Sequence, residues 1–270
     1  MTNNVREVFY LSDGTGLTIE SLGNSLLSQF NKHKFKIVNI PFIDTNSKAI
    51  KVQHKINESY TKSKIKPLVF YTIVNKDILK IINNSNGFFI DFFNPYLKLL
   101  EDELNQKPLN ISGKARSMGS YSDYKLRIDA LNYAIDNDDG ITTDYKNADI
   151  IILGVSRSGK TPVCLYLSLQ YKINVANYPL VDDDLINPIL PSFLDKYRDK
   201  LFGLSINPVR LSQIRFERRQ KGKYADIEQC KFEINQVEKM YKNERIKYLN
   251  TSNVSIEEMA VKILQLKKII

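Results

Sequence analysis

One stretch of the chain restricts its fold more than any other, because an apolar run, a glycine-containing loop and a helical pattern follow one another directly. The run Ala148–Leu153 is short and rich in isoleucine, which is typical of a buried parallel strand. Gly154 and Gly159 follow it, and apolar residues then repeat at helical spacing over residues 163–171. This order of strand, glycine loop and helix predicts an α/β fold built on a parallel sheet.

The loop itself has the pattern of a phosphate-binding loop (P-loop). Its two glycines are separated by four residues and followed by Lys-Thr, so successive backbone N–H groups can close around phosphate oxygens. Lys160 is predicted to place its charge on the terminal phosphates, as a catalytic residue, and Thr161 to hold Mg²⁺. The alternative is an ordinary strand-to-helix turn with a surface lysine. The predicted nucleotide-binding residues are Gly154, Val155, Ser156, Arg157, Ser158, Gly159, Lys160 and Thr161.

The first hundred residues alternate between strand and helix patterns. A helix is predicted to begin with Thr18 as its cap and to bury Ile19, Leu22, Leu26 and Phe30. Such βαβα order predicts a Rossmann-like domain with a parallel sheet, which we assign to residues 1–106. Apolar runs predict strands at residues 7–12, 35–40, 67–74 and 87–92, and helices near 46–62, 76–84 and 94–106.

Residues 107–270 form the second predicted domain, a P-loop kinase-like α/β domain. Between about residues 106 and 121 the pattern lapses into small and turn-forming residues, so we place the junction there. Ser255 and Glu258 predict a capping box for the last helix. The remaining predictions are helices near 122–136, from Asn207-Pro208 toward Arg219 and over 226–243, and strands near 173–181, 200–206 and 246–250.

Two sets of carboxylates follow predicted strands, where an α/β sheet gathers its ligand groups. Asp182, Asp183 and Asp184 end the strand after the glycine loop, and one of them can accept a proton from a hydroxyl nucleophile or hold Mg²⁺ through water. Asp183 is the predicted catalytic residue, and a helix cap with a turn is the alternative. Asp13, in the Ser-Asp-Gly-Thr-Gly turn after the first strand, is predicted to be catalytic as well, although plain turn chemistry explains that turn equally well.

Composition excludes several classes of protein. The chain has 270 residues, enough for two domains, and its two cysteines, Cys164 and Cys230, are too few for a disulfide framework or a zinc site. No run is apolar enough to cross a membrane and the first residues do not resemble a secretory signal, so we expect a cytoplasmic enzyme without a membrane partner. The two histidines, His33 and His54, lie in the first domain, which leaves carboxylates as the default proton acceptors.

The net charge of +9 is weak evidence for a nucleic-acid partner, because the lysines are scattered, and we predict none. The densest basic stretch has two open interpretations, a solvated helix face or a contact with phosphate or a partner protein. It comprises Arg210, Arg215, Arg218, Arg219, Lys221 and Lys223.

With these residues laid out, the chain resembles the bacterial and plant regulatory proteins that control the dikinases making phosphoenolpyruvate. The resemblance extends over nearly the whole length. It resembles the regulators of phosphoenolpyruvate synthase (pyruvate, water dikinase) more than those of pyruvate, phosphate dikinase. The matching blocks are Val8–Gly16, Pro67–Tyr71, Asp138–Gly140, Gly154–Pro162, Ala176–Pro179, Lys200–Leu204 and Asn250–Asn253.

This resemblance implies a bifunctional enzyme. It implies an ADP-dependent kinase that phosphorylates a threonine of phosphoenolpyruvate synthase and inactivates it, and a phosphorylase that uses inorganic phosphate to remove the group as pyrophosphate. ADP, inorganic phosphate and Mg²⁺ are the implied small molecules, the dikinase is the implied partner, and a homodimer would be unsurprising.

Three alternatives stay open at this point. The glycine loop alone also suits a kinase for a small metabolite or nucleotide, because it specifies phosphate and nothing about the acceptor. A nucleotide-sensing module without catalysis would bind ADP and transfer nothing. Nucleic-acid binding through residues 210–223 would depend steeply on salt.

Overall fold

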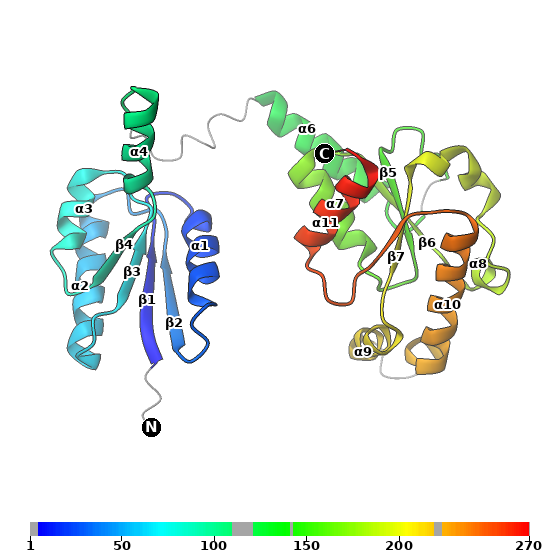
Figure 1. Ribbon diagram of the computed structural model, residues 1–270, viewed down its shortest axis with the longest axis horizontal. Coiled ribbons are helices and arrows are strands. Elements are labelled where there is room, and N and C mark those ends of the chain that lie inside the picture. The colour runs from blue at the N-terminus through cyan, green and yellow to red at the C-terminus, as the bar shows by residue number, and fades with distance from the viewer. Residues whose placement is uncertain (1–4, 110–120, 141–142, 219–222, 270) are drawn as a thin grey trace. The chain divides into compact units, whose positions relative to one another are not determined.

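Two separate parallel sheets organise the chain (Figure 1). The structure is a computed structural model that describes residues 5–109, 121–140, 143–218 and 223–269. The chain divides into two compact units, Met1–Met118 and Gly119–Ile270. The sequence predicts domains over residues 1–106 and 107–270, with a junction between about residues 106 and 121. Residues 110–120, which include most of the predicted junction, lie outside the described residues.

The first unit is a parallel sheet with helices on both faces. Its strand order is β2-β1-β3-β4, and all neighbouring strands are parallel. Helix α1 covers one face, and α2 and α3 cover the other (Figure 1). Its elements are β1 (Val5–Leu11), α1 (Leu17–Leu27), β2 (Lys34–Ile40), α2 (Asn46–Ser63), β3 (Leu68–Tyr71), α3 (Lys76–Asn83), β4 (Phe88–Asp91) and α4 (Asn94–Leu104).

Alternate residues of β1 enter the two cores of this unit. Val8 and Tyr10 pack with α1, whereas Phe9 and Leu11 pack with α2 and α3, as the two-residue period of a strand requires. The predicted α/β fold class is therefore confirmed for this half of the chain.

Helix α1 corrects two details of the prediction. It begins at Leu17 after Gly16, which has φ 80° and provides no side-chain cap, so the assignment of Thr18 as the cap is wrong. Its buried face is Ile19, Gly23 and Leu27, while Leu22 and Leu26 are 44% and 47% exposed. A Cβ at position 23 would lie 2.6 Å from the Tyr10 ring, so glycine allows this close contact. The wrong face was predicted because a glycine carries no apolar signal.

The second unit has the same strand order, β6-β5-β7-β8, and is also parallel throughout. The capping box of Ser255 and Glu258 and the Asn207 cap of α9 are both present, as predicted. The helical segments α8 and η1 were not predicted. The elements are α6 (Tyr121–Asp136), β5 (Ile150–Gly154), α7 (Lys160–Tyr171), β6 (Val175–Pro179), α8 (Asp182–Ile186), η1 (Ser192–Lys200), β7 (Leu201–Ser205), α9 (Pro208–Arg218), η2 (Lys223–Ala225), α10 (Ile227–Asn243), β8 (Tyr248–Asn250) and α11 (Ile256–Lys267).

Strand β5 is buried over its whole length and contributes side chains to both hydrophobic cores of the second unit. Ile150 and Ile152 pack with α7 and α11, whereas Ile151 and Leu153 pack on the side of α10. On that second side, a Cβ at Gly203 would lie 2.7 Å from the ring of Tyr241. The Tyr241 hydroxyl donates to the carbonyls of Leu153 and Leu204, at 3.1 and 3.2 Å, which joins α10 to two adjacent strands.

The two glycine turns noted in the sequence occupy corresponding places in the two sheets. Ser12–Gly16 follows β1, and the loop that begins at Gly154 follows β5. In each sheet that strand lies between the second and third strands along the chain, where the strand order reverses. Open α/β sheets bind ligands beyond the carboxyl ends of strands at such a point. Both turns are therefore candidate ligand sites by their position in the fold.

None of the helices in the described part of the chain is both long and apolar enough to cross a bilayer.

Candidate functional site

The loop between β5 and α7, residues 154–161, has a backbone that requires its two glycines. A Cβ at Gly154 would lie 2.6 Å from Ser158 Oγ and 3.1 Å from the Leu204 carbonyl oxygen. Gly159 has φ 96°, in the left-handed region that glycine adopts without strain. Arg157 also has a positive φ, 75°, which a residue with a Cβ adopts at a cost in free energy.

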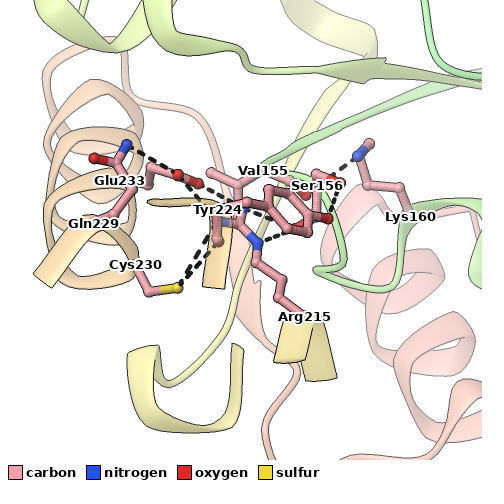
Figure 2. A network of polar contacts seen from close by, with 8 residues as sticks. All are labelled: Val155, Ser156, Lys160, Arg215, Tyr224, Gln229, Cys230 and Glu233. Atoms are coloured by element: carbon pink, nitrogen blue, oxygen red, sulfur yellow. Dashed lines mark hydrogen bonds and ion pairs between the residues drawn. The ribbon is translucent and has the colours of Figure 1, made fainter. Parts of the chain in front are cut away.

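Three carbonyl groups of this loop, those of Gly154, Val155 and Ser158, accept hydrogen bonds from donors outside the loop, near its end or, for Val155, also within it. The carbonyl of Val155 accepts from Lys160 Nζ at 3.2 Å (Figure 2). The same carbonyl accepts from Ser158 N, within the loop, at 3.3 Å. The carbonyl of Ser158 accepts from the Thr251 hydroxyl at 3.1 Å, and that of Gly154 accepts from Leu180 N at 3.1 Å. Because C=O and N–H of a planar trans peptide point in opposite directions, these bonds leave the neighbouring N–H groups directed away from the donors. This arrangement suits an anion.

Lys160 is the first residue of α7 and is buried, with 5% of its surface exposed. Burial lowers the pKa of Lys160 because it disfavours the charged ammonium, while the nearby charges of Asp139 and Asp138 act in the opposite direction. A negatively charged group bound beside Lys160 would favour the ammonium. The helix N-terminus, with its free N–H groups and partial positive charge, adds to this preference for an anion.

Thr161 contacts a carboxylate that the site prediction did not include. Its hydroxyl donates to Asp138 Oδ1 at 2.9 Å, and the same oxygen accepts from Asn177 Nδ2. The amide oxygen of Asn177 in turn accepts from Asp139 N at 2.9 Å, and Asn177 is completely buried. The segment after α6 is thus fixed against β6 and the start of α7.

Sequence reasoning missed the roles of Asp138, Asn177 and Thr251. Asp138 precedes the sheet strand that carries the loop, and no periodic pattern links it to Thr161, 23 residues later. All three residues lie in blocks of the family resemblance, but Asn177 also carries a physical signal, because it is a polar residue in the middle of an apolar strand. A buried amide there needs partners, which the Asp138-Asp139 segment supplies.

The predicted catalytic carboxylates lie in different places. Asp183 is exposed on α8, a helix that begins just after β6. The register of β5 and β6 pairs Gly154 with Pro179, so both strands end at the same edge. Asp184 takes the helix-capping role that was the alternative interpretation, because its carboxylate accepts from Val181 N at 3.1 Å.

Asp13 belongs to the other unit, where its carboxylate accepts from Val74 N at 3.0 Å and ties the turn after β1 to the segment after β3. The catalytic roles of Asp13 and Asp183 remain predictions.

Two buried polar atoms on the loop have no hydrogen-bond partner among the described residues: Ser158 Oγ and Arg157 Nε. Unsatisfied buried donors cost free energy unless a ligand or water completes them, so they fit an anionic group bound here. For a cation, Thr161 and Asp138 offer hard oxygen ligands of the kind that Mg²⁺ prefers. No group of three or more His, Cys, Asp or Glu side chains suited to a metal ion occurs in the described ranges. A Mg²⁺ ion at Thr161 would therefore share phosphate oxygens and water, as it usually does with nucleotides.

Comparison with known proteins relates the whole chain to a family. Residues 8–264 match the family described as Kinase/pyrophosphorylase. A relative from Hahella chejuensis is 48% identical over 262 residues, which cover 97% of this chain and 96% of the relative. Relatives from Marinobacter nauticus and Pseudomonas aeruginosa are 48% and 47% identical over 260 residues, 96% of this chain and 96% and 95% of the relatives. All three carry the provisional name phosphoenolpyruvate synthase regulatory protein. The predicted family is thereby confirmed, and the chain belongs to the kinase/pyrophosphorylase family.

Proposed function

We propose that this protein regulates phosphoenolpyruvate synthase by reversible phosphorylation of a threonine of that enzyme. ADP is the phosphoryl donor in one direction and inorganic phosphate is the acceptor in the other. The observation that supports this most is the combination of buried Lys160 with the Thr161–Asp138 hydrogen bond on one glycine loop, in a chain of the kinase/pyrophosphorylase family. A cytoplasmic location is part of the proposal.

In the kinase direction, the threonine oxygen of the dikinase bonds to the β-phosphorus of ADP while the bond from that phosphorus to the bridging oxygen breaks. AMP leaves with the bridging oxygen, and the threonine hydroxyl loses its proton. A phosphate-binding loop surrounds the β-phosphate of a nucleotide, and in ADP this is the group to be transferred. Lys160 and the loop amides would hold its oxygens as negative charge moves to AMP.

In the opposite direction, an oxygen of inorganic phosphate bonds to the phosphorus of the phosphothreonine, and the bond to the threonine oxygen breaks. Pyrophosphate leaves, and the threonine oxygen regains a proton. Neither direction requires a covalent bond to this protein. Positioning and charge neutralisation are sufficient for phosphoryl transfer of this kind.

We assign the metal-binding and proton-accepting roles from the positions of the side chains in the fold. Thr161 and Asp138 would hold Mg²⁺, which when bound neutralises phosphate charge. Asp183, exposed on α8, is accessible to a protein substrate and keeps its predicted role of orienting the acceptor hydroxyl and accepting its proton.

The test uses the full-length protein, Mg²⁺ and purified phosphoenolpyruvate synthase in its phosphorylated form. With ADP labelled in its β-phosphoryl group, we expect label on a dikinase threonine, identified by peptide mass spectrometry, and loss of dikinase activity. Addition of inorganic phosphate should then release labelled pyrophosphate and restore activity. Lys160→Met is the matched inactive control.

Other outcomes would contradict the proposal in distinct ways. ATP-dependent labelling of a small molecule, with no label on the dikinase, would indicate a metabolite kinase. ADP binding without transfer to any acceptor would indicate a sensing module.

A further inference from the structure

One arginine of the basic stretch is in the protein interior. Arg215, on α9, is 1% exposed, whereas its neighbours in the stretch Arg210 and Arg218 are exposed. Figure 2 shows that its guanidinium lies between the loop after β5 and helix α10. The interpretation of the stretch as a solvated face is therefore wrong for this residue, and its burial requires a compensating interaction.

The guanidinium of Arg215 uses its donors on two sides. On one side, Nη2 and Nη1 donate to the two carboxylate oxygens of Glu233 at 2.6 and 3.0 Å. On the other, Nη2 and Nε donate to the carbonyl oxygen of Ser156 at 3.1 and 3.3 Å. Nη1 also donates to the Tyr224 carbonyl at 2.9 Å, and the guanidinium lies 4.4 Å from the centre of the Tyr224 ring.

The surroundings keep this group charged and in place. Burial alone would lower the pKa of Arg215, but the hydrogen bonds and charge of Glu233 outweigh it and raise the pKa. Gln229 Nε2 donates to Glu233 Oε1 at 3.2 Å, and the hydroxyls of Ser156 and Tyr224 are 2.9 Å apart. One planar cation therefore joins the loop to η2 and α10, and the hydroxyl contact of Ser156 with Tyr224 is a second link to η2.

The bond to the Ser156 carbonyl fixes the next N–H group as well. The peptide between Ser156 and Arg157 is planar and trans, so a carbonyl held toward Arg215 directs the N–H of Arg157 to the opposite side. Arg157 has the positive φ of 75°, a backbone conformation that persists only where neighbouring contacts impose it. Arg215 supplies such a contact.

We propose that Arg215 is a positioning residue of the phosphate-binding loop: it holds the Ser156–Arg157 peptide so that the Arg157 N–H faces the bound phosphate, and Glu233 holds Arg215. This inference rests on the proposed function for the identity of the phosphate, which is that of ADP. A purely structural ion pair would need Glu233 only, whereas here two of the five guanidinium N–H groups donate to the loop. Lysine cannot replace this planar set of donors.

The test separates positioning from stability with a double substitution. Arg215→Met alone leaves the Glu233 carboxylate buried without its partner and is expected to destabilise the protein strongly. Arg215→Met with Glu233→Met removes both charges and retains side-chain volume, so thermal stability should return close to that of the wild type. The Ser156 carbonyl still lacks its donor in this double variant. We therefore expect restored stability without restored loop geometry.

Two measurements report on the loop. The amide resonance of Arg157, observed by NMR without ligand, should shift or broaden in the double variant. The affinity for ADP, measured by calorimetry, should fall about tenfold, the effect expected for one charge-assisted hydrogen bond. Arg198→Met is the matched control, because Arg198 is likewise an arginine paired with carboxylates, those of Asp195 and Glu244, but on the surface. It should leave both measurements unchanged.

Each outcome is decisive. A double variant with the wild-type Arg157 resonance and ADP affinity would overturn the inference. A shifted resonance in a protein whose wild type binds no ADP would support positioning and overturn the proposed function. If the double variant does not fold, Arg215→Lys is tested in place of the double variant. A lysine keeps the positive charge beside Glu233, but its single ammonium group cannot reproduce the planar bonds to Glu233 and to the carbonyls of Ser156 and Tyr224 at the same time. A shifted Arg157 resonance in Arg215→Lys supports the inference, and an unchanged one overturns it.

Discussion

The Thr161 hydroxyl donates a 2.9 Å hydrogen bond to Asp138, and this joins the start of helix α7 to the segment that follows α6. Both residues offer oxygen ligands, and Lys160 lies next to Thr161 in the chain. A cation held by this pair and the ammonium of Lys160 would therefore act on neighbouring phosphate oxygens.

Thr161→Val removes the hydroxyl and keeps the shape of the side chain. We expect the Mg²⁺-dependent part of ADP binding to disappear and the transfer rate to fall about 100-fold, the effect of roughly one metal-held contact. Calorimetric titration of ADP with and without Mg²⁺ measures the first effect. If Mg²⁺ still strengthened ADP binding to the variant by the wild-type factor, Thr161 would not be a metal ligand.

Asp138→Asn and Asp183→Asn should separate the two carboxylate roles. Asp138→Asn is expected to weaken Mg²⁺-ADP binding, because it removes a charge bonded to Thr161. Asp183→Asn should leave ADP affinity unchanged and lower the rate of threonine phosphorylation about 100-fold, within the range for a general base. The check is a comparison of ADP affinity with single-turnover transfer to the dikinase. The reverse pattern would exchange the two assignments.

Lys160→Met should stabilise the ligand-free protein while abolishing function. Burial makes the charged ammonium unfavourable, as its lowered pKa indicates, and Met fills the same space without a charge. A gain of about 1 kcal/mol would raise the unfolding temperature of a unit of this length by about 2–4 °C. ADP affinity should fall about 100-fold. Calorimetric unfolding and ADP titration measure both effects, and an unfolding temperature below that of the wild type would contradict the interpretation.

The affinity for ADP should decrease as pH rises from the pKa of Lys160 in the free protein toward its higher pKa in the complex. The pKa of Lys160 is lowered in the free protein and should rise when phosphate binds beside the ammonium. At a pH between these two pKa values, Lys160 is therefore protonated in the complex but deprotonated in the free protein, and ADP binding takes up a proton. Over that interval the logarithm of the binding constant should fall by up to about one unit per pH unit. Titration in buffers of different ionisation enthalpy would detect the proton uptake. In Lys160→Met this uptake should be absent, and its persistence there would assign it to another group.

Gly203→Ala should destabilise the second unit by about 1–3 kcal/mol, the usual cost of overpacking. The added methyl group would lie 2.7 Å from the ring of Tyr241, which is completely buried and cannot move aside. Gly14→Ala is the control, since a Cβ there meets only Ser12 Oγ at 3.8 Å. The free energy of unfolding of both variants, measured in urea, tests this prediction. Equal values for the two variants would show that the side chains around Gly203 rearrange to accept the methyl group.

The sequence predicted the order and type of most elements because each follows from local patterns. Apolar runs located the strands, and caps such as Ser255 and Asn207 located helix starts. The buried face of α1 differs from the prediction because Gly23 carries no apolar side chain, and its burial depends on a tertiary contact with the Tyr10 ring of β1. The short helix α8 and the 3₁₀ segment η1 lack an apolar period and escaped prediction.

At the site, local pattern identified the glycine loop but not the groups around it. Asp138, Asn177, Thr251 and Arg215 reach the loop region from four other segments, at separations that only the folded sheet defines. In the sequence, Arg215 is only one residue of a basic stretch. Its buried carboxylate partner, 18 residues later, could not be inferred from charge alone.

The contact between Gly203 and Tyr241 has a consequence for related sequences. The hydroxyl of Tyr241 reaches the carbonyls of Leu153 and Leu204 only because no side chain separates its ring from strand β7. A residue larger than glycine at position 203 therefore requires a side chain smaller than tyrosine at position 241. Across the family the two positions should covary, and a relative with alanine in place of Gly203 should lack the tyrosine.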